Sequence, residues 1–445
     1  MAHNLSCFAL GAVALILAAC GDTARFDESR GFGPKPELPQ ADPPRIATLN
    51  AAWARGWREG EGPVPAQSLR VGRFASGLDH PRWLHVLPNG DILVAESKAP
   101  DGQRCHSGFE LWIERLVLWF SGAGGTSADR ITLLRDADDD GVAELRTDLL
   151  TGLKSPFGMA LVGGHLYIAN TDAVVRFPYE VGATRITAAP ERVADLPASD
   201  GNCHWTKNLL ASRDGARLFV TVGSNSDHGE KGPAPEKDRA AILSLDLETR
   251  KLEAFASGLR NPSGLDWEPS SGTLWTTVNE RDELGSDLVP DYMTAVRQGD
   301  FHGWPCRYFG DRPDTRVPRE WNCSTVGSAL APDYSLGPHT ASLGLAFARG
   351  NSLPEFLRSG AFVAQHGSWN RRPRSGYKVI FVRFKGSEPN GDPVDVLTGF
   401  VDEHGNARGR PTGVAIDRHG ALLVADDVGN TVWRVTRAPA AGSGR

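Results

Sequence analysis

The pattern of apolar and polar positions returns in the same form six times along the chain. Each copy has an opening marked by Pro or Gly, a short apolar segment, a turn such as "PNG" or "DRHG", and a second apolar segment. Short apolar segments bounded by turn residues predict β-strands joined by tight turns. The copies begin at Phe74, Leu150, Ser199, Phe255, Ala341 and Gly409, at irregular spacings of roughly 50 to 80 residues.

Units of this kind predict an all-β fold, a six-bladed β-propeller of four-stranded antiparallel blades. One blade is a small sheet that cannot bury both of its faces, so the blades pack around an axis. We expect the first strand of each copy to be innermost, with the loop before it at the mouth of the central channel. A pair of β-sandwiches, the rival architecture, leaves the returning motif unexplained. The propeller should span residues 71–437, followed by a disordered tail at 438–445.

The segment at residues 109–120, "FELWIERLVLWF", interrupts the repeat. Its apolar positions fit a helix or a membrane-facing segment as well as a strand. We expect this segment to pack over the propeller. The alternative is a contact with a membrane or with a redox partner.

The N-terminus predicts export. The apolar run "CFALGAVALILAAC" is short for a membrane span, and its end at Leu17-Ala18-Ala19-Cys20 resembles a bacterial lipobox. We expect residues 1–19 to be removed and Cys20 to be lipidated; a plain secretory signal is the alternative. Residues 20–70 are polar and Pro-rich, which predicts a tether. The protein is therefore expected in the periplasm, anchored to a membrane.

Charge and cysteine content narrow the possible partners. The net charge is −6 and no long basic run occurs, which argues against a nucleic-acid partner. Beyond Cys7 and Cys20, four cysteines remain, and four cysteines allow three connectivities. Cys306 and Cys323 flank one loop and are expected to pair, which leaves Cys105 for Cys203. No CxxCH motif for covalent haem occurs.

Polar side chains gather in the loops that a propeller would place at the channel mouth. Arginine offers paired donors to carboxylates, so this set indicates an anionic ligand. A neutral histidine can take a proton at neutral pH. Ordinary salt bridges are the alternative role for these arginines. The set comprises His204, Lys207, Arg260, Asn261, Asn279, Glu280, Arg281, Asp282, His339, His366, Ser368, Asn370, Arg371, Arg408 and Arg410.

A second candidate site follows from the acidic stretch "RDADDDGVAE". Asp136, Asp138 and Asp140 stand at alternate positions before Gly141, as in the first half of an EF-hand calcium loop. The twelfth loop position is Thr147 rather than Glu, and the flanking segments read as strands. A hairpin turn that holds structural calcium is one interpretation. An Asp/Gly-rich turn capped by its own side chains is the other.

Five motifs, in order, carry a resemblance to a known family. They are "NCHWTKNLL", "GLRNPSGL", "VNERDELGSDLVPDYM", "FHGWPCRYFG" and "GRPTGVAIDRHGALLVAD". Together they resemble the soluble dehydrogenases that depend on pyrroloquinoline quinone (PQQ), in the L-sorbosone or aldose sugar dehydrogenase branch. The resemblance runs from about Val71 to Val435. It implies a six-bladed propeller that holds PQQ over its channel with Ca²⁺ beside it.

The resemblance also implies roles for single residues. The catalytic histidine of the family falls on His204, which takes the proton of the substrate hydroxyl while hydride passes from the same carbon to quinone C5. Arg260, followed by Asn261, would stabilise the oxyanion at the quinone carbonyl, which calcium would also polarise. The remaining implied contacts are the backbone carbonyls of Glu280 and Arg281 to calcium, and Arg410 and Arg408 to the cofactor carboxylates.

The chain departs from the family pattern at several of these positions. Cys203 stands where relatives carry an Asp before the histidine, so the orienting role is vacant or passes to Asp200. Ser155 stands where relatives have a Gln that contacts the quinone. A cofactor lysine has no clean equivalent, and the nearest polar residues in that blade are His339, Asn370 and Arg371.

The sequence therefore predicts a PQQ- and calcium-dependent dehydrogenase that oxidises an aldose or a sorbosone-like sugar aldehyde. Electrons would pass to a respiratory acceptor, a membrane quinone or cytochrome c. Two alternatives stay open, a calcium-dependent lactonase on the same architecture and a non-catalytic propeller that binds a ligand on its face.

Overall fold

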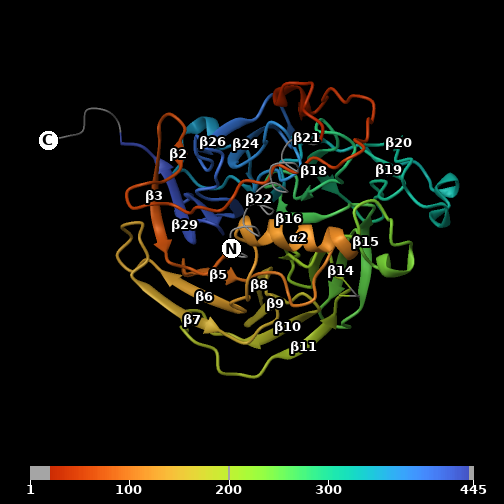
Figure 1. Cartoon of the computed structure of the whole chain (residues 1–445). Coiled ribbons are helices and arrows are strands. Elements are labelled where there is room, and N and C mark those ends of the chain that lie inside the picture. The colour runs from red at the N-terminus through yellow and green to blue at the C-terminus, as the bar shows by residue number, and fades with distance from the viewer. Residues whose placement is uncertain (1–20, 199–200, 440–445) are drawn as a thin grey trace, which may run out of the picture.

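The structure, a computed structural model, describes residues 21–198 and 201–439, and the expected leader 1–19 and lipid site Cys20 lie outside the described residues. Its strands form six antiparallel sheets arranged around an axis (Figure 1), each with four main strands, which confirms the six-bladed propeller. The first strand of each repeat is the innermost strand of its blade, as expected.

The first three blades follow the chain in simple order, from the inner strand to the outer strand. Blade 1 contains β4 (Pro81–Val86), β5 (Ile92–Glu96), β6 (Arg130–Arg135) and β7 (Leu145–Leu150). Blade 2 contains β8 (Met159–Val162), β9 (His165–Ala169), β10 (Ala173–Pro178) and β11 (Glu191–Asp195). Blade 3 contains β12 (Leu209–Ala211), β13 (Arg217–Val222), β14 (Ala241–Asp246) and β15 (Leu252–Ser257).

The other three blades recruit strands from elsewhere in the chain. Blade 4 contains β16 (Pro262–Trp267), β17 (Leu274–Val278), β18 (Pro290–Val296) and β21 (Tyr334–Pro338), and β1 (Phe32–Gly33) adds to its edge. Blade 5 contains β22 (Ser342–Phe347), β23 (Gly360–Gln365), β24 (Lys378–Lys385) and β26 (Val394–Thr398), with β2 (Val64–Pro65) and β25 (Glu388–Pro389) at its margin. Blade 6 contains β27 (Pro411–Ile416), β28 (Leu422–Asp426), β29 (Thr431–Arg437) and β3 (Leu69–Ser76).

Ring closure joins the two ends of the propeller. β3 pairs antiparallel with β29, from Leu69 opposite Arg437 to Ser76 opposite Thr431. The last blade therefore takes its outer strand from the start of the domain. Without this pairing β29 would present an open strand edge.

The same turn joins the two inner strands in three blades. In "PNG", "RDG" and "DRHG", Gly90, Gly215 and Gly420 have φ of 93°, 70° and 82°. Each glycine N–H donates to the carbonyl three residues earlier, at 2.9, 3.0 and 2.9 Å. Glycine adopts this positive φ at no steric cost, so the recurring glycine fixes the turn.

The hydrophobic core lies between the blades rather than within them. Each of the six main core clusters combines side chains from two neighbouring blades. One cluster, for example, packs Trp83 and Leu93 of blade 1 against Phe157, Met159 and Ile168 at blade 2. Every blade thus buries its two faces against different partners.

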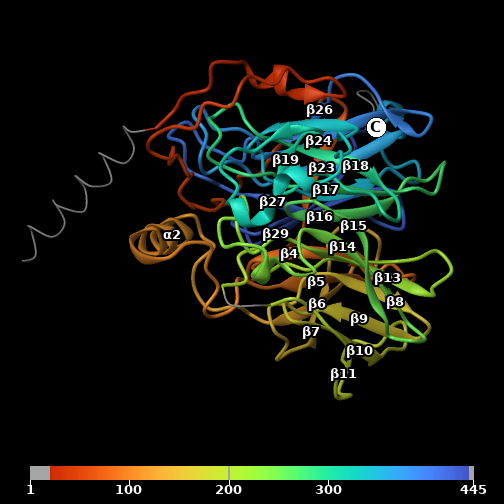
Figure 2. The same cartoon turned by 90° about the vertical axis from the view of Figure 1, so that its right-hand side faces the viewer.

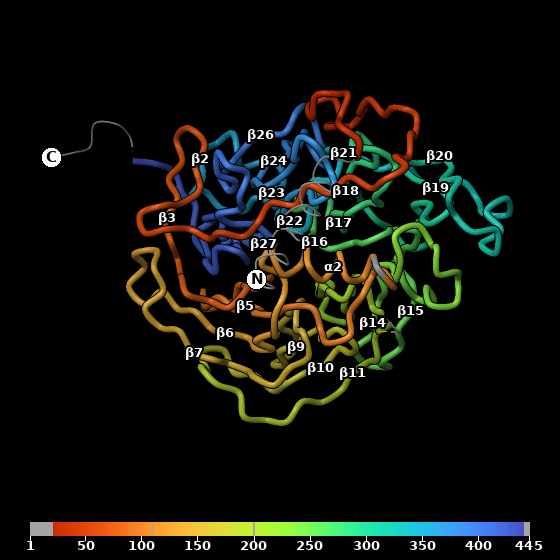
Figure 3. The backbone as a smooth tube through the Cα atoms, in the orientation of Figure 1, coloured from red at the N-terminus to blue at the C-terminus, as the bar shows by residue number. Residues whose placement is uncertain are grey.

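The segment expected as a tether lies against the propeller over its described part. We call residues 21–57 the N-terminal strap. The Asp22 N–H donates to Thr48 Oγ1 at 2.8 Å, and the Ser286 N–H donates to Asp22 Oδ2 at 2.9 Å. Figure 3 shows the strap, red to orange, running over blades 4 and 5 and then across the propeller towards β2 and β3. Pro-rich composition alone did not reveal these contacts.

Residues 108–120 form a helix, α2 (Gly108–Phe120), in the connection between β5 and β6. α2 lies over the mouth side of the propeller (Figures 1 and 2), as the expectation of packing over the propeller required. At its end Phe120 stacks on Trp53 of the strap, with ring centroids 4.7 Å apart. Among the described residues, no helix is long and apolar enough to cross a membrane.

Smaller elements and two disulfides complete the fold. Cys306 pairs with Cys323, and Cys105, just before α2, pairs with Cys203 in blade 3, so both expected pairings are present. The short elements are the β19 (Arg307–Tyr308) and β20 (Arg312–Pro313) hairpin and the 3₁₀ turns η1 (Glu28–Gly31), η2 (Ala234–Glu236), η3 (Arg319–Trp321), η4 (Cys323–Thr325) and η5 (Glu355–Leu357).

A substitution in β3 tests how much the closing strand stabilises the fold. Phe74 is 4% exposed and packs in the cluster between blades 6 and 1. Phe74→Ala should lower the free energy of unfolding by about 3–5 kcal/mol, since it leaves a cavity. Arg70→Ala, at an exposed position of the same strand, should change it by less than about 0.5 kcal/mol. Urea denaturation followed by circular dichroism measures both; equal losses would contradict the closing role.

Candidate active site

His204 lies in the loop before β12, at the channel mouth of blade 3. Its Nδ1 lies 2.8 Å from the Ser224 carbonyl oxygen and 3.1 Å from Ser224 Oγ. The carbonyl can only accept, so Nδ1 carries the proton and Nε2 keeps a free lone pair. This is the tautomer that a general base needs.

Burial keeps the His204 ring neutral. It lowers the pKa of His204 well below the usual range, and the positive charge of Arg260 lowers it further. The ring is therefore neutral over the physiological pH range and able to accept a proton.

Three further contacts fix the backbone around His204. Cys203 is held by its disulfide to Cys105, and its N–H donates to Asn225 Oδ1 at 3.0 Å. Lys207 Nζ donates to the His204 carbonyl at 3.0 Å, and the Lys207 side chain is fully buried. Burial holds the pKa of Lys207 well below its usual value. The Ser224 carbonyl thus orients the His204 ring, the role for which the sequence offers no Asp directly before the histidine. Asp200, the other candidate for this role, lies outside the described residues.

Arg260 lies beside His204 at the start of blade 4 and is already fully engaged. Its Nη2 donates to Asp227 Oδ1 at 2.8 Å, and its Nε donates to the Asp227 carbonyl at 3.2 Å. Its Nη1 donates to the Glu280 carbonyl at 2.7 Å. Arg260 therefore contributes positive charge at the mouth, while its donors are used within the protein.

These contacts bear on the expected calcium ligands. The Glu280 carbonyl accepts from a guanidinium, and the Glu280 carboxylate pairs at 3.0 Å with Arg281 Nε. The Arg281 side chain points away to the Pro305 and Arg307 carbonyls. The Glu280 carbonyl already accepts from the Arg260 guanidinium, so it does not fit the role of a calcium ligand in the arrangement described.

An acidic group completes this side of the mouth. Asp282 lies 3.7 Å from Arg260 Nη2, accepts from Asn370 Nδ2 at 2.7 Å and lies 3.3 Å from His339 Nδ1. Burial lowers the pKa of His339, but the hydrogen bond and charge of Asp282 outweigh it, and the pKa is raised overall. His339 and Asn370 are thus linked to the mouth by their contacts with Asp282.

Blade 6 contributes Arg410 to the opposite side of the channel. The Arg410 N–H donates to Asp426 Oδ1 at 2.7 Å, and its Nη2 donates to Tyr377 Oη at 2.9 Å. Its side chain is 6% exposed, and its Nε has no hydrogen-bond partner. Arg410 therefore retains a donor for an anionic ligand.

A cluster that the sequence reasoning largely missed lies next to Arg410. Asp427 accepts from Arg82, and its Oδ2 lies 2.9 Å from His366 Nε2 and 3.5 Å from His80 Nε2. Burial lowers the pKa of His80 to about 3 and that of His366 to about 4, so both rings are neutral at pH 7. Only His366 was in the expected set.

Alignment of the repeats contains the signal for this cluster. "FASGLDHPRW" and "FASGLRNPSG" place His80 and Asn261 at the same position, directly before the first proline of an inner strand. Arg410 precedes Pro411 in the same way, and Ser155 precedes Pro156 at the matching sequence position, where the inner strand β8 begins only at Met159. Four blades therefore present this position to the channel mouth.

Three expected cofactor residues have other roles in the structure. The Arg371 side chain is 1% exposed and donates to the Ser286 and Pro373 carbonyls, which anchors the loop under the strap. Arg408 pairs with Glu403 at 3.2 Å, while its buried Nε, like that of Arg410, has no hydrogen-bond partner. Ser155 is buried with φ of 43°, and its N–H donates to Asp129 Oδ1 at 2.8 Å.

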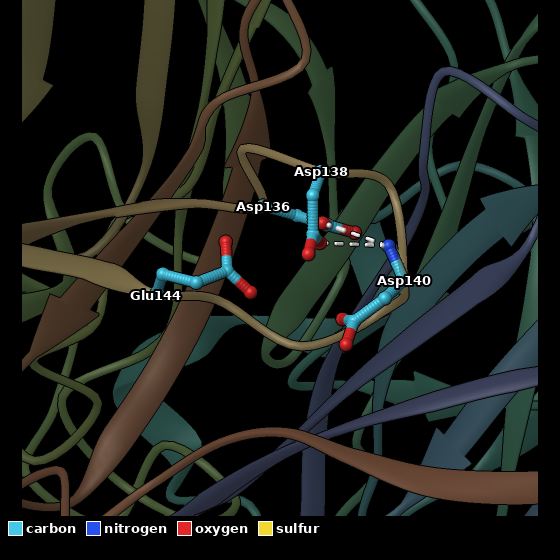
Figure 4. A group of neighbouring side chains, drawn as sticks. All are labelled: Asp136, Asp138, Asp140 and Glu144. Atoms are coloured by element: carbon cyan, nitrogen blue, oxygen red, sulfur yellow. Dashed lines mark hydrogen bonds between the residues drawn. The ribbon is translucent and has the colours of Figure 1, made fainter.

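The acidic loop lies at the other end of the propeller, in the turn between β6 and β7. Asp136, Asp138, Asp140 and Glu144 each offer an oxygen, and these atoms all lie within 4.8 Å of one another (Figure 4). Glu144 was not in the expected set. The Asp140 and Gly141 N–H groups donate to the Asp136 carboxylate at 3.1 and 2.9 Å, so the side chains also cap the turn.

The fit of a quinone is tested by the buried polar atoms that have no partner in the described structure. Asn261 Oδ1, Asn370 Oδ1, Arg410 Nε and Asp427 Oδ1 are such atoms. These four belong to the loops around the mouth, whereas the other buried atoms without a partner are spread over the rest of the described structure. Buried polar groups are ordinarily hydrogen-bonded, so these atoms indicate a polar ligand at the mouth.

The fold and this site define a six-bladed propeller with a neutral histidine and a buried arginine at the channel mouth. The TrAA12-like family model matches residues 127–298 and 308–438, more than half of the 445 residues. The chain therefore belongs to the TrAA12-like family, and the resemblance to PQQ-dependent sugar dehydrogenases is confirmed at the level of the family.

Two relatives are similar in sequence. A PQQ-dependent pyranose dehydrogenase of Coprinopsis cinerea is 46% identical over 223 residues, which are 40% of this chain and 30% of that protein. An uncharacterized protein of Borreliella burgdorferi is 29% identical over 294 residues, 64% of this chain and 76% of that protein.

Solved structures support the fold. The PQQ domain of the Coprinopsis cinerea pyranose dehydrogenase, in its holo form, has a TM-score of 0.66 at 20% identity, covering 87% of this chain and 100% of that chain. A calcium structure of the Trichoderma reesei family AA12 enzyme gives 0.68 at 16%, with 88% and 99% covered. The soluble aldose sugar dehydrogenase of Escherichia coli gives 0.56 at 16%, with 83% and 99% covered.

The protonation state of His204 can be measured directly. We expect ¹⁵N NMR to show His204 as the Nδ1–H tautomer and to show no titration between pH 8 and about pH 6, since burial holds its pKa well below 6.5. Comparison with His204→Gln assigns the signal. A midpoint near 6.5, or an Nε2–H tautomer, would contradict the assignment of a base.

Proposed function

We propose that the protein is a PQQ-dependent dehydrogenase that oxidises an aldose sugar or a sugar aldehyde, with sorbosone-like compounds among the candidates. The observation that carries the proposal is His204, a half-buried neutral histidine whose Nε2 is free at the mouth of a propeller. Membership of the TrAA12-like family and the pyranose dehydrogenase relative support PQQ as the cofactor.

The residues present fit a quinone with carboxylate groups. Arg410 supplies a buried cation with an unused Nε donor for a carboxylate, and the amide oxygens of Asn261 and Asn370, which have no partner, can accept from an N–H or O–H group of the ligand. Arginine suits carboxylates because its donors are planar and paired. We propose these three residues as the contacts to the cofactor.

The chain's own part in the reaction is proton removal. Nε2 of His204 takes the proton of the substrate hydroxyl, and the Nδ1–H bond to the Ser224 carbonyl holds the ring in the tautomer that allows it. When bound, PQQ supplies the acceptor for the hydride that leaves the same carbon. The buried charge of Arg260 then favours the negative charge that develops nearby.

Calcium at this site remains a prediction. The Glu280 carbonyl is taken by Arg260, so we assign no step to the metal. The Asp227 and Asp282 carboxylates beside Arg260 are a source of negative charge for a cation if the guanidinium moves. Measuring PQQ binding with and without Ca²⁺ decides the question.

We further propose that the protein is a periplasmic lipoprotein acylated at Cys20. Its electrons would pass to a respiratory quinone or to cytochrome c. The "LAAC" sequence supports this placement.

His204→Gln tests the mechanism apart from cofactor binding. The chain from residue 21 should bind PQQ near-stoichiometrically by calorimetry, and the variant should bind it equally well. Turnover in a dye-linked assay with aldoses and aldehydes should fall by about 10²–10⁴, as loss of a general base requires. His165→Gln, at the β8–β9 turn, is the matched control and should keep full turnover.

Normal turnover of His204→Gln would remove the mechanism even if PQQ binds. An absence of binding at micromolar PQQ would remove the cofactor. In that case the lactonase and the non-catalytic propeller would become the leading functions.

The acidic loop yields a separate prediction. If it holds calcium, Ca²⁺ at one hundred times its Kd should stabilise the protein by about 2.7 kcal/mol. Asp138→Asn should abolish the part of the calcium-dependent rise in Tm that is not due to the quinone site. Asp195→Asn is the control, because the Asp195 side chain is 84% exposed and lies outside the acidic loop; this variant should keep the rise. Differential scanning calorimetry in Ca²⁺ and in EDTA measures this rise in Tm. If the rise is unchanged in Asp138→Asn, the loop is an Asp/Gly-rich turn capped by its own side chains and not a calcium site.

A further inference from the structure

The large apolar side chains exposed on the described surface are unevenly placed. Of the ten residues of this kind, five belong to the strap and α2. We call these five the aromatic surface. They are Ile46 (54% exposed), Trp53 (53%), Trp112 (46%), Trp119 (68%) and Phe120 (42%).

α2 is an apolar helix that the rest of the protein covers only in part. No side chain described in α2 is buried, and no residue of α2 belongs to any of the core clusters. Trp112 and Trp119, two turns apart, lie on the same side of the helix. A helix that is apolar around most of its circumference is ordinarily buried in a core or in a membrane.

The strap extends this surface across the mouth. Trp53 stacks on Phe120, and the Ala54 N–H donates to the Phe120 carbonyl at 2.8 Å. Figure 2 shows α2 standing out from the blades at the left, on the side where the strap also runs. The strap and α2 therefore meet within the aromatic surface, at Trp53 and Phe120.

The position of Asp22 indicates what covers this surface. Asp22 is bound to Thr48 and Ser286, so the chain is attached to the propeller two residues after Cys20. Two residues span at most about 7 Å. A lipid on Cys20 would thus lie close to the strap, without the spacer that the composition suggested.

We propose that the aromatic surface binds the interfacial region of a phospholipid bilayer, so that the channel mouth faces the membrane. The choice of a bilayer over another partner rests on the proposed lipid at Cys20. Tryptophan and phenylalanine favour the boundary between head groups and acyl chains, where an amphipathic helix lies in the plane of the interface. A lipid-soluble electron acceptor then reaches the site without leaving the membrane.

Vesicle binding of the chain from residue 21 tests the surface without the lipid. This chain keeps every described contact. Vesicles of phosphatidylcholine are used, because the net charge of −6 would oppose anionic lipid. The protein should float with the vesicles, and dibrominated phosphatidylcholine should quench part of its tryptophan fluorescence.

Trp119→Ser should weaken the partition coefficient about tenfold, which corresponds to about 1.4 kcal/mol. Phe356→Ser is the matched control, because Phe356 is 43% exposed in the loop after β22, at the end opposite the mouth. The control should bind vesicles as the unchanged protein does. PQQ binding of both variants should be unaltered.

Several results would overturn the proposal. They are no flotation of the unchanged chain, equal weakening by Phe356→Ser, a dimer that Trp119→Ser dissolves, or a raised KM for sugar as the only effect of Trp119→Ser. Mass spectrometry of Cys20 and the PQQ titration are separate measurements, so failure of the proposed lipidation or of the proposed function is distinguished from failure of the surface.

Discussion

No blade of this protein can bury both faces of its sheet alone, and the rest of the structure depends on that constraint. Each main core cluster is shared by two neighbours, so the blades hold one another in place. The loops before the inner strands inherit this rigidity. His204, Arg260 and Arg410 therefore converge from three different blades onto one mouth, although 206 residues separate the first from the last. A site assembled in this way is positioned by strands rather than by its own loops.

The chemistry at the mouth is set by burial as much as by residue type. His204 is kept neutral by desolvation, and a backbone carbonyl rather than a carboxylate fixes its tautomer. Arg260 and Asp227, by contrast, both stay charged at the mouth, because their direct ion pair offsets the cost of burying the two charges. The disulfide of Cys203, the residue directly before His204, links this loop to the connection that carries α2. The mouth is thus held by covalent and backbone contacts.

Sequence periodicity was sufficient for the blades, the inner strands and the position of His204 in an entry loop, because local apolar patterning and ring packing agree. It could not show which charged side chains face the mouth and which form ion pairs or hydrogen bonds elsewhere. Arg371 and Arg408 look equivalent to Arg410 in sequence, but only the structure shows that the first anchors a loop and the second pairs with Glu403. The strap was read as a tether because its contacts are mostly backbone hydrogen bonds and single side chains. The cluster of His80 and Asp427 can be predicted only from an alignment of the repeats, in which His80 takes the same position as Asn261.

The pairing of β3 with β29 has a consequence for the order of folding. β3 is among the first segments of the domain to be made, whereas its partner is the last strand. Such a contact spans nearly the whole chain, and long-range pairing of this kind is slow to form. A chain that is synthesised from its N-terminus cannot complete the ring until its final strand has been made. The nascent protein therefore keeps an unpaired strand edge at blade 6 until synthesis ends.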